Sequence, residues 1–190
     1  MTGLMINKIL NYFDELIPNP KCELNYCSDF EFLIAVVLSA QTTDYKVNSV
    51  TKELFKYDIN SLKIEEINNI IKPIGMSLKK SYYVKGIPKS KDELLKLDGV
   101  GNKTANLVLS TLYNEPYFAV DTHVTRVSKR LGLVSDNAGV LEIEKKMYEL
   151  IPKNLLNRSH HQFVLFGRYY CTSRNPKCKD CKLKSKYYNK

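Results

Sequence analysis

The sequence predicts an all-helical protein, built as one compact domain or as two small lobes that pack closely. Three observations lead to this prediction. Apolar residues recur at three- and four-residue spacing in most segments, proline and glycine separate those segments, and no convincing pair of strands is present. The chain has 190 residues, 44% hydrophobic and 26% charged, which excludes a disordered or fibrous protein.

The first half of the chain contains four helical patterns. The first covers residues 5–17 and ends before two prolines. Residues 30–38 are nearly all apolar and fit a buried helix or a buried strand, and Asp29 as a candidate N-cap favours the helix. The helical spacing then continues over residues 47–55 and 64–71.

The second half begins with a capping box, in which Ser90 and Glu93 satisfy each other's backbone amides. A glycine-containing turn and a further apolar helix over residues 105–112 follow. The remaining helices are expected over residues 122–131, 137–150 and 155–169.

The chain is basic, with 29 Lys and Arg against 20 Asp and Glu and a net charge of +9. This charge suits a polyanion such as DNA, but a solvated lysine-rich surface explains it equally well. No apolar run is long enough to cross a membrane, and the N-terminus lacks the pattern of a secretory signal. We therefore expect a cytoplasmic protein without a membrane partner.

A helix-hairpin-helix pattern surrounds Gly99, Val100 and Gly101. Amides at the start of its second helix can bind a phosphate, although a plain tight turn fits the same residues. Lys103 lies in the first turn of that helix, where the helix dipole and burial would lower its pKa. A neutral amine can attack a sugar carbon and form a Schiff base, but a surface lysine is the alternative.

Asp121 also has two interpretations. An aspartate directly before a helix is usually its N-cap. If Asp121 instead shares a cleft with Lys103, its carboxylate can stabilise a cationic sugar and move protons. The spacing of the two residues does not decide between these roles.

Three motifs together resemble the bacterial endonuclease III family of helix-hairpin-helix, Gly/Pro-Asp DNA glycosylases. They are LSAQTTD at residues 38–44, LDGVGNKTAN at 97–106 and AVDTH at 119–123, and GRYYC at 167–171 also matches. The resemblance implies a two-lobed helical DNA glycosylase fold. DNA would bind in the groove between the lobes.

The resemblance also implies lobe boundaries. A central six-helix lobe would cover residues 21–116, with the hairpin at about 93–112. Residues 1–20 and 117–190 would form the second lobe, which ends in the cysteine-containing segment 171–187.

The family removes oxidised pyrimidines from double-stranded DNA and cleaves 3′ to the abasic site by β-elimination. By resemblance, Lys103 and Asp121 are catalytic, Gln41 fills the gap left by the extruded nucleotide, and Met76 is the apolar wedge. The expected DNA contacts are Gln41, Met76, Gly99, Val100, Gly101, Arg168, Arg174 and Lys177. We expect a nucleoid-associated monomer that acts on damaged bases or abasic sites.

Cys171, Cys178 and Cys181 match three ligands of the family's [4Fe-4S] cluster, but Tyr187 stands at the position of the fourth. Cys22 and Cys27 are the only other candidates for a fourth thiolate. We therefore expect the cluster to be absent or labile, and we expect no organic cofactor. A zinc site that combines the three cysteines with His160 or His161 is an alternative.

The segment 79–87 is shorter than in the family by about three turns, and we expect no full helix before the hairpin. Two other functions remain open. One is a non-catalytic helix-hairpin-helix DNA-binding protein, which a spoiled site would favour. The other is an adenine glycosylase of the same superfamily, which lacks a lysine where Lys103 stands.

Overall fold

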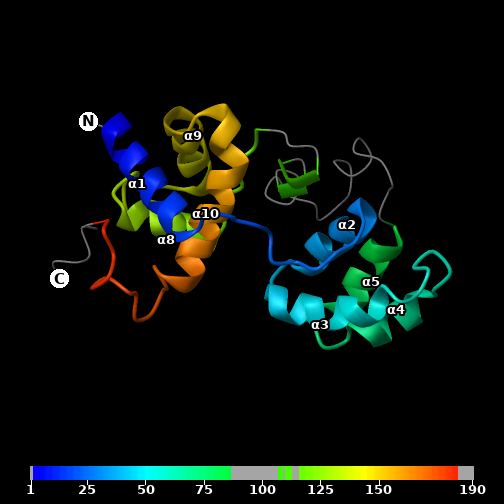
Figure 1. Ribbon diagram of the computed structural model, residues 1–190. Coiled ribbons are helices and arrows are strands. Elements are labelled where there is room, and N and C mark those ends of the chain that lie inside the picture. Colours follow the sequence, from blue (N-terminus) through cyan, green and yellow to red (C-terminus); the bar gives the residue numbers. More distant parts are fainter. Residues whose placement is uncertain (1, 87–106, 109, 113–115, 184–190) are drawn as a thin grey trace. The chain divides into compact units, whose positions relative to one another are not determined.

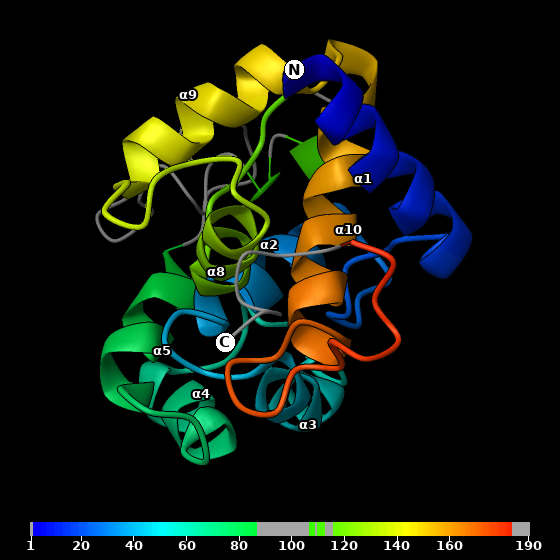
Figure 2. The same cartoon turned by 90° about the vertical axis from the view of Figure 1, so that its left-hand side faces the viewer.

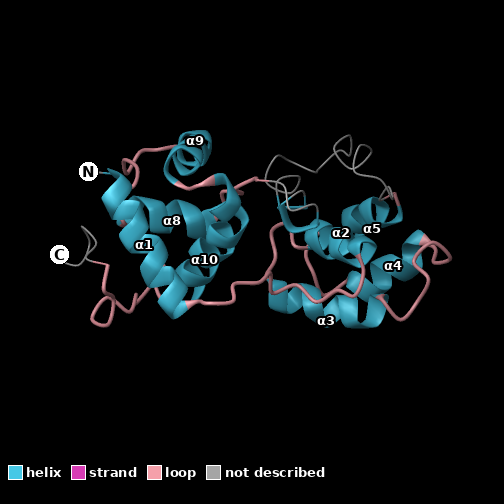
Figure 3. Cartoon of the chain, turned by 45° about the horizontal axis from the view of Figure 1, so that its top comes forward, coloured by secondary structure: helices cyan, strands magenta, loops and turns pink. Residues whose placement is uncertain are grey.

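The computed structural model describes residues 2–86, 107–108, 110–112 and 116–183. All regular structure in these ranges is helical, as predicted (Figure 3). The chain divides into two compact units. The inner unit is Glu23–Val108, and the terminal unit combines Met1–Cys22 with Leu109–Lys190. The expected lobe boundaries stay a prediction, because residues 113–115, just before the expected boundary at 116, lie outside the described residues.

The inner unit contains helices α2, α3, α4 and α5 (Figure 1). They cover Asp29–Leu38, Asp44–Leu54, Ile64–Ile71 and Ser77–Lys85. The apolar segment at 30–38 is the buried helix α2, whose N-cap is Ser28 and not Asp29. The hydroxyl of Ser28 accepts from the Glu31 amide at 3.2 Å, while Asp29 places its charge in the first turn, where the helix dipole favours it.

The expectation that no full helix fits before the hairpin was wrong. Helix α5 runs for nine residues, because it begins at Ser77, ahead of the segment that looked too short. Its last residue, Lys85, donates from Nζ to the Asn60 carbonyl oxygen at 2.6 Å. This contact ties the end of α5 to the loop before α4.

The terminal unit is built from α1, α8, α9, the short 3-10 helix η1 and α10 (Figure 2). They cover Thr2–Leu16, Thr122–Arg130, Val140–Leu150, Lys153–Leu155 and Leu156–Tyr169. Helix α9 begins three residues later than expected, because Gly139 takes the N-cap position.

Aromatic rings form the centre of the terminal unit. The ring of Phe13 on α1 lies 5.1 Å from that of Phe163 and 4.8 Å from that of Phe166 on α10. All three side chains are almost fully buried. Burying each one contributes about 1.5–3 kcal/mol, so this cluster holds α1 against α10.

Two sequence predictions fall where little is described. The capping box of Ser90 and Glu93 and the hairpin glycines lie outside the described residues. Residues 107–108 and 110–112 are helical, in line with the expected helix over 105–112. Of the helices that the structure describes, none has the length and apolar character that a membrane crossing needs.

Helices α8 and α10 cross closely at Gly167. A Cβ atom at this position would lie 2.9 Å from Cβ of His123 and 3.2 Å from Cγ2 of Val127. Protein interiors are close-packed, so neither neighbour has free space to move into. The crossing therefore requires glycine.

We predict that Gly167→Ala lowers the free energy of unfolding by about 1–3 kcal/mol, because the added methyl group forces α8 and α10 apart. Thermal or urea unfolding measures this loss. The matched control is Gly75→Ala, where the new Cβ meets no atom within 4 Å. If the two variants unfold alike, the crossing tolerates a side chain.

Candidate active site

Asp121 is the N-cap of α8. Its Oδ1 accepts a hydrogen bond from the Val124 amide at 2.7 Å, and its backbone is extended. The capping role is therefore confirmed. A carboxylate has two oxygens and about four acceptor sites, so the cap leaves capacity for a substrate.

His123 is a neighbour of Asp121 that the sequence analysis did not single out. Its Nδ1 lies 3.1 Å from Nη2 of Arg126. A guanidinium only donates, so Nδ1 accepts, and the ring proton of the neutral imidazole is on Nε2. Burial lowers the pKa of His123, the Arg126 and Arg168 charges lower it further, and Asp121 opposes the shift. We infer a neutral imidazole beside the Asp121 carboxylate.

The expected nucleophile and hairpin lie outside the described residues. These are Lys103, Gly99, Val100 and Gly101. The structure does describe Gln41 and Met76 in the inner unit. Both are exposed, and both have φ of 58°, in the left-handed region that non-glycine residues rarely adopt.

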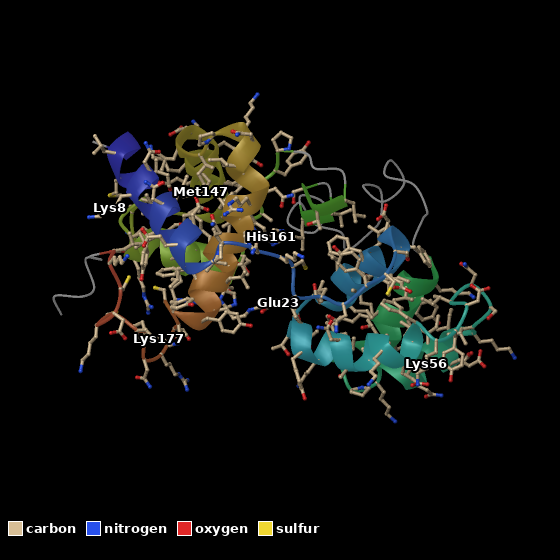
Figure 4. All side chains as sticks on the ribbon, viewed as in Figure 1. Lys8, Glu23, Lys56, Met147, His161 and Lys177 are labelled. Atoms are coloured by element: carbon tan, nitrogen blue, oxygen red, sulfur yellow. The ribbon has the colours of Figure 1, made fainter. Side chains whose placement is uncertain are left out.

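The three basic residues expected to bind DNA all belong to the terminal unit. Arg168 is half-buried on α10, whereas Arg174 and Lys177 are exposed in the segment that follows. Figure 4 shows Lys177 in the segment after α10. Its Nζ lies 5.2 Å from the centre of the Tyr170 ring. That cation–π contact anchors the lysine stem near the end of α10.

Two arginines on α8 hold the segment after α10. Arg126 donates to the carbonyl oxygens of Gly167 at 2.6 Å and Cys171 at 2.9 Å. Arg130 donates to the carbonyl oxygen of Thr172 at 2.6 Å. The sequence analysis missed this role. The available signal was the spacing of the two arginines by four residues, which puts them on one helix face.

The three expected metal ligands line one cavity of about 170 Å³ in the terminal unit. Cys171, Cys178 and Cys181 share it with apolar side chains, among them Phe166 and Leu183. Burial raises the pKa of the Cys181 thiol. Within the described ranges, no three His, Cys, Asp or Glu side chains are gathered so that they could hold a metal ion.

The alternative zinc site with a histidine is contradicted. His160 is only 4% exposed, and its ring lies 5.6 Å from that of Phe118 in the core. Eleven residues of chain separate it from Cys171, which corresponds to about 16 Å along a helix. His161 lies ten residues before Cys171, which corresponds to about 15 Å along a helix. Neither histidine can share a metal with the cysteines.

An all-helical chain of two units, with an aspartate that caps a helix and a basic segment beside it, fits a helical DNA repair protein. A family model supports this directly. Residues 34–153 match the HhH-GPD superfamily of base excision DNA repair proteins. The chain belongs to this superfamily.

Individual relatives agree with the family. Endonuclease III of Bacillus subtilis is 42% identical, over 93% of this chain and 88% of its own length. Endonuclease III of Rickettsia felis is also 42% identical, over 100% of this chain and 97% of its own. A solved structure of a trapped endonuclease III–DNA covalent intermediate with an estranged adenine matches with a TM-score of 0.88 and 42% identity, covering 96% of this chain and 94% of that one.

Endonuclease III proteins typically carry a [4Fe-4S] cluster, but the donor set that the described residues gather at this cavity does not fit one. A cube of this type takes four thiolates. The cavity supplies three thiols, and the fourth family position is Tyr187, which lies outside the described residues. The contacts from Arg126 and Arg130 hold the segment after α10 by hydrogen bonds that need no metal.

We predict that the protein, purified without oxygen, contains fewer than four iron ions and fewer than four sulfide ions per chain. We also predict that Cys171→Ser leaves the metal content and the melting temperature nearly unchanged, because hydrogen bonds and packing hold the segment. Iron and sulfide assays and thermal unfolding test both statements. A stoichiometric four-iron cluster that survives air would contradict this prediction.

Proposed function

We propose that this chain removes oxidised pyrimidines from double-stranded DNA and then cleaves the strand 3′ to the abasic site. Its broader class is a base-excision DNA glycosylase with abasic-site lyase activity. The observation that carries this function is the 42% identity, over 96% of the chain, to an endonuclease III trapped in a covalent intermediate with DNA.

Lys103 is the proposed nucleophile. The lone pair of its neutral Nζ attacks C1′ of the extruded nucleotide, and the damaged base leaves with the electrons of the glycosidic bond and takes up a proton. The sugar ring opens to a Schiff base between Nζ and C1′. This iminium acidifies the C2′ proton, and its removal expels the 3′ phosphate by β-elimination. Water then releases the lysine.

Asp121 is proposed to stabilise the positive charge that develops on the sugar. The capping bond from Val124 fixes one carboxylate oxygen, so the side chain is already oriented before DNA binds. An oriented charge needs no reorganisation during the reaction, which is the main advantage of electrostatic stabilisation in enzymes.

DNA binding is proposed to use three sets of groups. The amides of Gly99, Val100 and Gly101 contact phosphate oxygens. Gln41 and Met76 enter the base stack when the nucleotide leaves it. Arg168, Arg174 and Lys177 supply positive charge from the terminal unit. The protein would act as a monomer on the bacterial nucleoid, in the cytoplasm.

The two alternative functions are less well supported. Similarity to endonuclease III along nearly the whole chain is not expected of a non-catalytic DNA-binding module. An adenine glycosylase of this superfamily does not require a lysine at position 103. The proposed role of Lys103 separates the glycosylase–lyase from both.

We predict that Lys103→Ala abolishes the adduct trapped by borohydride on duplex DNA that carries an oxidised thymine. Without the amine no Schiff base forms, so borohydride has nothing to reduce. Lys56→Ala, at an exposed lysine paired with Glu53, should trap like the unchanged protein. Undiminished trapping by Lys103→Ala would identify another amine as the nucleophile.

We predict that Asp121→Asn lowers the single-turnover rate of base excision by a factor of about 100 or more, because it removes the negative charge. Its melting temperature should hardly change, since asparagine caps helices as well as aspartate does. Asp121→Ala is the matched variant: it should lose the activity and also about 1 kcal/mol of stability. Near-normal turnover of Asp121→Asn would leave Asp121 with the capping role alone.

A further inference from the structure

Two exposed residues of the inner unit adopt a left-handed backbone although neither is glycine. Gln41 lies in the loop between α2 and α3, and Met76 is the N-cap of α5; φ is 58° at both. Such a conformation persists only where the surrounding structure determines it. The contacts that hold these two loops therefore decide where the Gln41 and Met76 side chains lie.

Lys80 connects the two loops. Its backbone amide donates to the Met76 carbonyl oxygen at 2.9 Å, in the first turn of α5. Its side-chain Nζ donates to the carbonyl oxygen of Leu38, also at 2.9 Å. Helix α2 ends at Leu38, three residues before Gln41. The same residue thus contacts the end of α2 and the start of α5, which pack against each other (Figure 3).

The position of the Leu38 carbonyl explains this contact. The last carbonyl groups of a helix have no partner within it and carry the negative end of the helix dipole. The chain turns away directly afterwards, where the Thr42 amide donates to Ser39. An ammonium group therefore satisfies a carbonyl that the helix leaves open.

The ammonium group is unusually buried. Lys80 is 2% exposed, and desolvation by the surrounding protein lowers its pKa. None of the ion pairs among the described residues includes it. Burying a cation without a partner carboxylate costs free energy. The hydrogen bond from the charged Lys80 ammonium to the Leu38 carbonyl oxygen is stronger than a neutral one and offsets part of that cost. The neighbouring Lys79, by contrast, is exposed, so its ammonium group stays in water.

We propose that Lys80 is a positioning residue for nucleotide extrusion: it holds the loop of Gln41 against the first turn of α5, which presents Met76. This inference rests on the proposed roles of Gln41 and Met76 in filling the base stack. Extruding a nucleotide costs stacking and pairing energy. On the proposed roles, Gln41 and Met76 offset this cost when both side chains enter the base stack. A misplacement of about 1 Å can lower a rate by a factor of about 100.

The inference separates two steps of the reaction. Opening a base pair requires that Gln41 and Met76 be correctly placed. β-Elimination at an abasic site whose partner base is also missing does not depend on the placement of Gln41 and Met76. A change at Lys80 should therefore affect the first step much more than the second.

The test compares Lys80→Met with Lys79→Met as the matched control on the same helix. One substrate is a duplex with a paired oxidised thymine. The other is a duplex whose abasic site faces a second abasic site, so that no base pair has to be opened. Single-turnover rates are measured with saturating protein on both.

We expect Lys80→Met to slow excision on the paired substrate by a factor of about ten or more, because it removes a charged hydrogen bond. Cleavage of the doubly abasic duplex should stay within about twofold of the unchanged protein. Lys79→Met should stay within about twofold on both substrates. Lys80→Arg keeps a charged donor and should recover part of the activity on the paired substrate.

Several outcomes would overturn the inference. Equal losses on both substrates would show that Lys80 only supports folding, and circular dichroism would show the same loss of structure. Unchanged rates on both would show that the contact with Leu38 is dispensable. Failure of the unchanged protein to act on either substrate would overturn the proposed function, and this inference with it.

Discussion

The arrangement of the terminal unit depends on the close crossing of α8 and α10 at Gly167. Because no side chain intervenes, the Arg126 guanidinium reaches the Gly167 carbonyl oxygen at 2.6 Å and Nδ1 of His123 at 3.1 Å. The same guanidinium also donates to the carbonyl oxygen of Cys171, two residues after the end of α10. One contact point thus fixes the helix that Asp121 caps and the start of the basic segment.

Much of this fold could be predicted from the sequence, because most of its helices bury one apolar face. The spacing of apolar residues therefore located α1 to α4 and α8 to α10 within a few residues. The prediction failed at α5, where Lys80 is buried and Leu78 and Tyr82 are exposed. Two lysines of α5 donate to carbonyl oxygens of other segments, and such contacts leave no apolar pattern in a sequence.

The candidate site, like the fold, could be predicted from the sequence only in part. The family resemblance indicated Asp121, Gln41 and Met76, whose roles stay predictions. The structure adds that Asp121 is an N-cap and that Gln41 and Met76 have a left-handed backbone. The neighbours that fix them were missed. Arg126 and Lys80 act on carbonyl oxygens 41 and 42 residues away in the chain, and no local spacing reveals a partner that distant.

Capping and catalysis by Asp121 are compatible for a physical reason. The first amides of a helix need an acceptor, and the N-terminus of a helix favours a negatively charged one such as a carboxylate. The bond to Val124 uses one oxygen, and the carboxylate keeps further acceptor sites for its proposed role. His123, kept neutral by burial and by the arginine that donates to it, adds no positive charge to cancel that of the carboxylate. The two roles of Asp121 that the sequence leaves open therefore do not exclude each other.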